Sequence, residues 1–204
     1  MKKIMFNDKY GLTQAVLEGR KTQTRRTFLK RGEEFLLHGI TPGYFISVRS
    51  RYTLGETIAI AQKYEDLIKN DEFYRLCGKN GMPLECIKYE RGCNNKMFVR
   101  ADLMPHHICI TKIRMERLQD ISDEDCLKEG ICRSDIKNTL WGVAPIRGEG
   151  ESGTTYEHSV LGYGPWHLFP SVKRAYASLI DRISGKGTFE SNPYVFVYDF
   201  ELIE

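Results

Sequence analysis

The residues best able to do chemistry cluster in one basic run near the start of the chain. Between Arg20 and Arg31 there are six lysines and arginines and no acidic residue. Arg20, Arg25 and Arg26 can each hold a phosphate through two parallel hydrogen bonds, because the guanidinium group is a planar fork. Residues 1–31 carry nine basic and two acidic residues, whereas the rest of the chain carries 21 basic and 25 acidic ones. This asymmetry predicts an anion-binding surface, and the alternative is a solvated basic loop.

Aromatic side chains could add flat faces on which a nucleic-acid base stacks. The candidates are Tyr44, Tyr163 and Trp166. Trp166 follows the sequence GYGP in a glycine-rich context, which would suit a lid over a ligand. The alternative for each is a place in the core, and for Trp166 it is to plug one end of a β-barrel.

Histidines and cysteines give weaker signals. His106 and His107 are adjacent at the start of an expected strand, so they point to opposite faces and at most one could act as a proton shuttle, for example in a ribonuclease. Cys77, Cys86 and Cys93 fit no common zinc spacing and are expected to be reduced free thiols. A metal site built from these thiols and a histidine is the alternative. The sequence predicts neither a metal nor a cofactor.

The elements that must position these residues follow from the hydrophobic pattern. A short helix is expected over residues 12–18, with Thr13 as its N-cap, and it leads directly into the basic run. Alternating or continuous apolar residues predict three strands: 55–61, 108–118 with a bulge between 110 and 113, and the stretch after Pro193. Serine before and glycine after an apolar pattern predict two further helices: 122–130 and 171–185.

Two segments lack a regular pattern. Residues 62–97 are interpreted as an irregular, cysteine-containing insertion with some helix around 64–76, and not as an independent domain. Residues 132–170 form a long loop rich in glycine and aromatic residues, which is typical of a functional or mobile segment. The order of the elements favours a single α+β domain over residues 1–204 and not a wound parallel sheet.

Composition limits the class of protein. With 204 residues, 41% hydrophobic and 28% charged, the chain is long enough for one folded domain with a substantial core. Only a few apolar residues follow the two N-terminal lysines, so no signal peptide is expected. No stretch approaches the roughly 20 apolar residues of a membrane helix. We therefore expect a cytoplasmic protein with no membrane partner.

The sequence LEGRKTQTRR at residues 17–26 resembles the signature of the ASCH superfamily. Three further stretches are similar to the longer, phage-associated ASCH-like proteins: Met104-Pro105, residues 116–122 and Asn192-Pro193. The likeness covers almost the whole chain, apart from 62–97 and much of 132–170. It implies a PUA-like small β-barrel with flanking helices and long loops.

The resemblance also implies work on nucleic acids, because PUA-like domains are associated with RNA, often with modified RNA. Small bacterial ASCH members are amidohydrolases that remove the acyl group from N4-acetylcytidine. Their catalytic lysine, threonine and glutamate fall on Lys21, Thr24 and Glu129 of this chain. The match at Glu129 is looser, since only Ser122 and the spacing from it anchor the assignment.

The three residues could support such chemistry. A threonine becomes a nucleophile when a base takes its proton, and neighbouring arginines or burial would lower the pKa of Lys21 for that role. Glu129 could then protonate the leaving amine. Residues three apart point to opposite faces of a strand, so Lys21 and Thr24 cooperate only if the chain turns or bulges between them. A close Lys21–Glu129 ion pair would keep Lys21 charged, and a purely structural pair is the alternative.

Three functions stay open at this point. The favoured one is binding of RNA or a modified nucleotide in a basic cleft between residues 20–26 and the helix that carries Glu129. The second is an amidohydrolase that deacylates an N4-acylated cytidine. The third is a structural or interaction protein of a phage or mobile element.

Overall fold

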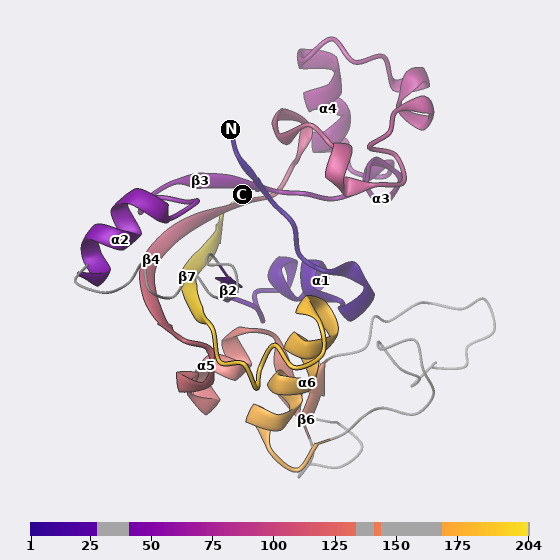
Figure 1. Cartoon of the computed structure of the whole chain (residues 1–204). Helices are drawn as coiled ribbons and strands as arrows, with labels where there is room; N and C mark the ends of the chain where they lie inside the picture. The colour runs from indigo at the N-terminus through magenta and orange to yellow at the C-terminus, as the bar shows by residue number, and fades with distance from the viewer. Residues whose placement is uncertain (28–40, 134–140, 144–168, 204) are drawn as a thin grey trace, which may run out of the picture.

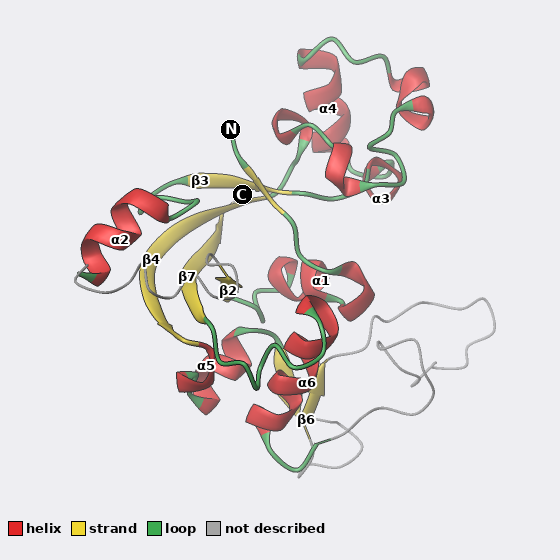
Figure 2. Cartoon of the chain, in the orientation of Figure 1, coloured by secondary structure: helices red, strands yellow, loops and turns green. Residues whose placement is uncertain are grey.

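The computed structural model of the chain describes residues 1–27, 41–133, 141–143 and 169–203. Its centre is a five-stranded, mostly antiparallel sheet in which the strands follow the order β1-β3-β4-β7-β2 (Figures 1 and 2). The strands are β1 (Lys3–Ile4), β2 (Gln23–Thr27), β3 (Thr57–Ile60), β4 (His107–Arg117) and β7 (Tyr194–Ile203). Helices cover the sheet, so the expected α+β class is confirmed.

The long central pair β4 and β7 gives the sheet its curvature. The two strands are antiparallel over almost their full length, with a register shift between Ile110 and Lys112. This shift is the bulge predicted from the change of apolar parity after Ile110. A bulge increases the local twist of a strand, and both strands curve strongly in Figure 1.

The curved sheet is not closed into a barrel within the described residues, which corrects the expected barrel. Its edge strands β1 and β2 do not pair with each other. The physical reason is the length of β1: its two residues pair in parallel with β3 on one edge and offer too little backbone for a second ladder to β2. A side chain spans the opening instead, where Arg26 Nη2 donates to the carbonyl of Met5 at 2.6 Å.

The helices expected from capping residues are present. They are α1 (Leu12–Leu17), α5 (Asp123–Lys128) and α6 (Val172–Ser184), while α2 (Pro42–Arg49) was not expected. The hydroxyls of Ser122 and Ser171 accept hydrogen bonds from the backbone N–H three residues on and cap α5 and α6. Thr13 does not cap α1, whose N-cap is Gly11; its hydroxyl instead donates to Asp8 at 2.5 Å.

Residues 62–97 fold into short helices around a second apolar cluster, which they share with Ala59, Ala61, Val99, Leu103 and Met104. The α-helices are α3 (Tyr64–Leu67) and α4 (Asp71–Lys79), which lie beyond one end of the sheet (Figure 1). Tyr64 stacks on Phe73, with ring centroids 5.5 Å apart. Gly92 packs so closely against the Tyr64 ring that a Cβ at residue 92 would lie 2.5 Å from its Cε2 atom. The insertion is therefore fixed to one geometry.

Short elements complete the described chain. The 3₁₀ turns are Asp8–Tyr10, Leu84–Tyr89, Lys96–Phe98, Ala101–Leu103 and Leu118–Asp120. The expected loop 132–170 lies mostly outside the described residues, but β5 (Ile131–Arg133) and β6 (Trp141–Val143) pair at its start. No helix in the described ranges is long and apolar enough to cross a membrane.

Candidate functional site

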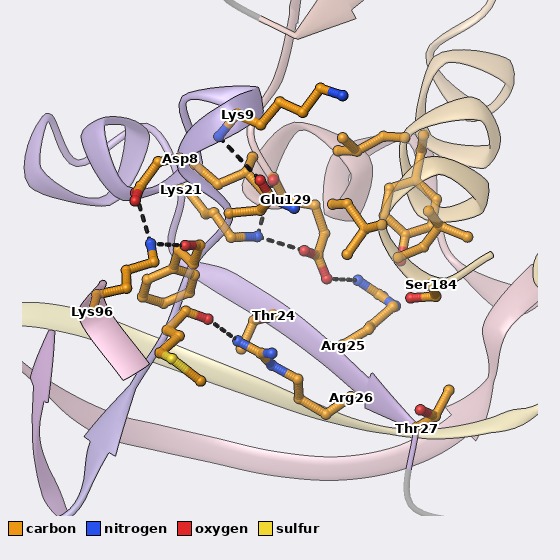
Figure 3. Close-up of a pocket in the computed structure, with 18 of the residues that line it drawn as sticks. Asp8, Lys9, Lys21, Thr24, Arg25, Arg26, Thr27, Lys96, Glu129 and Ser184 are labelled. Atoms are coloured by element: carbon orange, nitrogen blue, oxygen red, sulfur yellow. Dashed lines mark hydrogen bonds and ion pairs between the residues drawn. The ribbon is translucent and has the colours of Figure 1, made fainter. Parts of the chain in front are cut away.

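A pocket of about 710 Å³ lies beside the edge strand β2 (Figure 3). Four parts of the chain form most of its lining: the N-terminal residues 5–9, residues 21–27, the insertion residues 94–96 and one face of α6. Pockets that bind small molecules have volumes of roughly 300–1,000 Å³. The cavity is therefore large enough for a ligand of nucleotide size.

Consecutive residues of β2, from Thr24 to Thr27, border this pocket. Neighbouring residues of a strand point to opposite faces, but β2 is an edge strand and the pocket runs alongside it. Lys21 precedes the strand, and its N–H donates to the carbonyl of Ala15 at 2.9 Å. Lys21 therefore lies outside the strand that carries Thr24, and both residues line the same pocket.

Lys21 and Glu129 form a buried ion pair. Lys21 Nζ lies 2.5 Å from Glu129 Oε2, and the side chains are 2% and 7% exposed. Nζ also donates to the carbonyls of Gln23 at 2.7 Å and of Glu129 at 2.9 Å. An ammonium group has three N–H donors, and here all three have acceptors. In this structure Lys21 is therefore held as a fully hydrogen-bonded cation.

Burial lowers the pKa of Lys21 below its usual value. Desolvation is the largest cause, and the positive charges of Arg26 and Arg25 act in the same direction. Glu129 raises the pKa through its charge and its hydrogen bond, but does not cancel the burial. The proton of this lysine is consequently easier to remove than that of a surface lysine.

Arg25 is buried and uses its whole guanidinium group inside the protein. Its Nη2 lies 2.7 Å from Glu116 and 2.9 Å from Asp125, and its Nη1 lies 3.2 Å from Glu129. Nη1 also donates to Gln23 Oε1, and Nε donates to Glu116. Desolvation alone would lower the pKa of Arg25, but Glu129 and Glu116 raise it above its usual value. No N–H donor remains for a phosphate, which was the role expected from the sequence.

This network also fixes the position of Glu129. Arg114 on β4 contacts Asp125 at 2.5 Å and Asp199 at 2.5 Å, so it ties the start of α5 to the centre of the sheet. Glu129 is the C-cap residue of α5, and its N–H donates to the carbonyl of Asp125. Acids from three elements therefore surround Arg25 and Arg114, and Glu129 faces the pocket at their edge (Figure 3).

Thr24 and Arg26 are two residues of β2 that line the pocket and have donors left for a ligand. The Thr24 side chain has no hydrogen-bond partner among the described residues, although the residue is only 5% exposed. Arg26 is exposed and, among the described residues, its side chain makes a single hydrogen bond, to the carbonyl of Met5. The two residues lie two apart on β2 and share one face of the strand. Together they offer a hydroxyl and most of a guanidinium fork to the pocket.

The insertion contributes pocket residues that sequence reasoning missed. Lys96 Nζ contacts Asp8 Oδ1 at 2.7 Å and Thr13 Oγ1 at 3.2 Å, and it also donates to the carbonyl of Phe6. This lysine therefore attaches the insertion to the N-terminal segment. Lys63 at the pocket rim pairs with Glu65 at 2.9 Å. No sequence signal marked these residues, because residues 62–97 have no periodic pattern.

The pocket lining carries more positive than negative charge. The described lining residues include six cations and two acids: Lys9, Lys21, Arg25, Arg26, Lys63, Lys96, Asp8 and Glu129. Several of the cations are neutralised by pairing, but their excess favours an anionic ligand.

Other expected site residues lie elsewhere. Arg20 pairs with Glu18 at 2.6 Å on the surface and does not line the pocket. Tyr44 lies on α2 and is 63% exposed, also away from the lining residues. His106 and His107 do not line the pocket either, and burial lowers the pKa of both. Tyr163 and Trp166 lie outside the described residues.

The cysteines of the insertion do not form a metal site in the described part of the chain. Cys77 is buried, Cys93 is half-buried and Cys86 is exposed, and all three are free thiols. No group of three or more histidines, cysteines or acids among the described residues is arranged to hold a metal ion.

Comparisons with protein-family models, with curated proteins and with solved structures find no match for this chain. The function therefore has to be inferred from the geometry and charge of the pocket.

Proposed function

We propose that the protein binds a nucleotide, either a free modified nucleotide or one unit of an RNA chain, in the pocket beside β2. The observation that carries this proposal is the pair Thr24 and Arg26, whose donors face a positively charged pocket and are not used up by the protein itself. Arg26 would hold the phosphate through two N–H groups, and the Thr24 hydroxyl would add a third hydrogen bond.

The buried charges support this role without contacting the phosphate directly. Lys21 and Arg25 are paired with Glu129, Glu116 and Asp125, so they add no excess of positive charge; instead their ion pairs hold the start of β2 in place and so position Thr24 and Arg26. The attraction for the phosphate therefore rests on Arg26. The curved sheet with the basic run at its edge is also consistent with the proposed relationship to PUA-like ASCH domains, although it is not a closed barrel.

Two matched variants test the proposal. Arg26→Ala removes a pocket cation, and Arg20→Ala removes a surface cation from the same basic run. Affinity for nucleoside monophosphates and for short single-stranded RNA is measured by calorimetry. We expect Arg26→Ala to weaken binding about tenfold or more, because charge-assisted hydrogen bonds are lost, and Arg20→Ala to change it less than about twofold.

Salt dependence and unphosphorylated ligands complete this test. Phosphate contacts should make the affinity fall as salt rises, and nucleosides should bind more weakly than their monophosphates. Equal losses in both variants would mean that the basic run attracts anions non-specifically. That result, or no binding by the wild-type protein, would refute the proposed function.

The amidohydrolase is the second candidate, because Lys21, Thr24 and Glu129 line one pocket and the Thr24 hydroxyl is free to react. The three N–H donors of Lys21 are engaged, so it can act as a base only after its proton has passed to Glu129. The lowered pKa of Lys21 and the short contact with Glu129 favour that transfer.

The protons balance in such a reaction. Neutral Lys21 takes the Thr24 proton as the Thr24 oxygen attacks the amide carbonyl, and Glu129 protonates the amine as the C–N bond breaks. Water then cleaves the acyl-threonine; Glu129 takes a proton from the water and Lys21 returns one to Thr24, which restores the starting state.

A pair of substitutions at residue 24 tests the catalytic role. Release of cytidine from N4-acetylcytidine is followed for the wild type, Thr24→Ser and Thr24→Val. Serine keeps the hydroxyl and should retain turnover, whereas valine has a similar shape without the oxygen and should abolish it. Turnover by Thr24→Val, or none by the wild type, would eliminate this mechanism.

A further inference from the structure

The hydroxyl group of Tyr176 on α6 is buried in the wall of the pocket without a hydrogen-bond partner. Tyr176 is 1% exposed, and its hydroxyl is one of two buried side-chain polar groups without a partner in the described part of the chain. Buried hydroxyls are nearly always hydrogen-bonded, because an unpaired one has lost its water and gained nothing in return. An exception in a pocket wall indicates a group that is kept for a ligand.

The position of this hydroxyl places it near the charged end of the pocket. Its strongest electrostatic partners are Glu129 and Arg25, and both also line the pocket. The Arg25 guanidinium lies 6.0 Å from the ring centroid of Tyr176. Phe189 packs edge-on against the same ring at 6.3 Å. The Arg25 guanidinium and the Phe189 ring are therefore both neighbours of the Tyr176 ring.

The chemistry of the phenol determines what it can recognise. Burial raises the pKa of Tyr176 well above its usual value, and the negative charge of Glu129 adds to this effect. The group therefore stays protonated near neutral pH and can donate a hydrogen bond. The matching group on a ligand is a hydrogen-bond acceptor such as a carbonyl oxygen.

The rest of this wall is apolar. Leu179, Ile180 and Ile183 follow Tyr176 at the spacing of one helix face, and all of them line the pocket. Ile180 is half-buried and packs against the core, whereas Ile183 is 37% exposed, so the stripe is open at its Ile183 end. A flat molecule with an apolar face could pack against it, with its polar edge directed towards Tyr176.

We propose that Tyr176 donates a hydrogen bond to a carbonyl oxygen on the base of the bound nucleotide and so determines which bases are accepted. This inference rests on the proposed nucleotide-binding function. The base lies on the aliphatic wall of α6 while Arg26 holds its phosphate. Because the Tyr176 oxygen is covered in this structure, the side chains around it shift when the base reaches it. Uracil, cytosine and guanine carry a carbonyl oxygen, and adenine does not.

The test uses Tyr176→Phe, which removes only the hydroxyl. Affinities for uridine, cytidine and adenosine monophosphates are measured by calorimetry, and the melting temperature is measured without ligand. We expect about fivefold to tenfold weaker binding of the uridine and cytidine nucleotides, with adenosine monophosphate changed less than about twofold. The free variant should melt at the same or a higher temperature, because an unpaired buried oxygen is gone.

Tyr64→Phe is the matched control. Tyr64 is equally buried, but its hydroxyl accepts a hydrogen bond from the backbone N–H of Arg100 at 2.9 Å and does not line the pocket. This variant should lower the melting temperature and leave every affinity unchanged.

The outcomes distinguish a failure of the proposed role of Tyr176 from a failure of the proposed nucleotide-binding function. If the wild type binds nucleotides and Tyr176→Phe binds them equally well, or loses affinity equally for all bases, the role of Tyr176 is refuted while the pocket stands. A lower melting temperature with unchanged affinity would mean that a buried water satisfies the hydroxyl, which also refutes it. If the wild type binds no nucleotide, the proposed function fails and this inference falls with it.

Discussion

Replacing Glu129 by glutamine tests the buried charge network most directly. Glu129 accepts from Lys21 through one carboxylate oxygen and from Arg25 through the other. Glutamine has the same shape but only one acceptor oxygen, and its NH₂ group must face one of the two cations. The change therefore leaves the buried Lys21 without its carboxylate partner and adds an N–H donor next to Lys21 or Arg25.

The size of the effect follows from the contacts that remain. Removing one partner of a buried ion pair typically costs about 3–5 kcal/mol, because the other charge is left uncompensated. Arg25 keeps Glu116 and Asp125, and Lys21 keeps two carbonyl acceptors. We therefore expect Glu129→Gln to lower the free energy of unfolding by about 3 kcal/mol, the lower end of that range.

The pH dependence gives this prediction a distinctive signature. Glu129 raises the pKa of Lys21, so its loss lowers that pKa further below the usual 10.5. When the folded pKa lies below the unfolded one, the unfolded chain binds more protons between the two values, and stability rises with pH in that window. The destabilisation should therefore shrink as the pH rises towards the usual lysine pKa of 10.5, because Lys21 becomes neutral in the folded variant below that value.

The assay is urea unfolding followed by circular dichroism at several pH values. Glu18→Gln is the matched control, because Glu18 pairs with Arg20 at the surface and such pairs contribute about 0–1 kcal/mol. The double variant Lys21→Met, Glu129→Gln should recover much of the stability lost, since no unpaired lysine remains. A loss below about 1 kcal/mol, or one that does not vary with pH, would refute the idea that Lys21 is a buried cation held by Glu129.

Three further predictions concern the elements around the pocket. Gly92→Ala should lower the free energy of unfolding by about 2 kcal/mol, because the new Cβ would lie 2.5 Å from the Tyr64 ring. The expected results are a lower melting temperature and faster proteolysis within residues 62–97. An unchanged melting temperature would contradict this prediction. Ser122→Ala removes the N-cap of α5 and should cost about 1 kcal/mol in urea unfolding, whereas Ser122→Asp should cost less. Desolvation raises the pKa of Asp125, but Arg25, Gln23 and Arg114 lower it, and the folded pKa lies below the usual 3.8. The ionised Asp125 side chain therefore stabilises the fold above pH 3.8, and this stabilisation is lost as the pH falls towards the folded pKa. Asp125→Asn should flatten acid unfolding in this range, and an unaltered acid transition would show that other carboxylates dominate.

The sequence alone determined the elements that depend on local signals. The helices that follow Ser122 and Ser171 could be predicted because a cap and an apolar stripe lie within the same short segment. The bulge after Ile110 followed from a change of parity within one strand. The cations of the basic run could also be recognised from the sequence, because the charge of a side chain follows from its residue type alone. Strand β1 was not predicted, because two residues are too few to show an alternating apolar pattern. Helix α2 was not predicted either.

Only the tertiary structure decided what each cation of the run does. Arg20, Arg25 and Arg26 are chemically identical in the sequence, yet Arg20 pairs at the surface, Arg25 is surrounded by buried acids and Arg26 faces the pocket. The acids that bury and hold Arg25 come from residues some 90 to 100 positions away, namely Glu116 and Asp125. Local pattern cannot encode such distant contacts. The fold decides them by placing α5 next to the edge strand β2 and by bringing Glu116 of β4 within reach of Arg25 across β7. As a result Arg20 forms a surface pair, Arg25 is buried among acids and Arg26 faces the pocket.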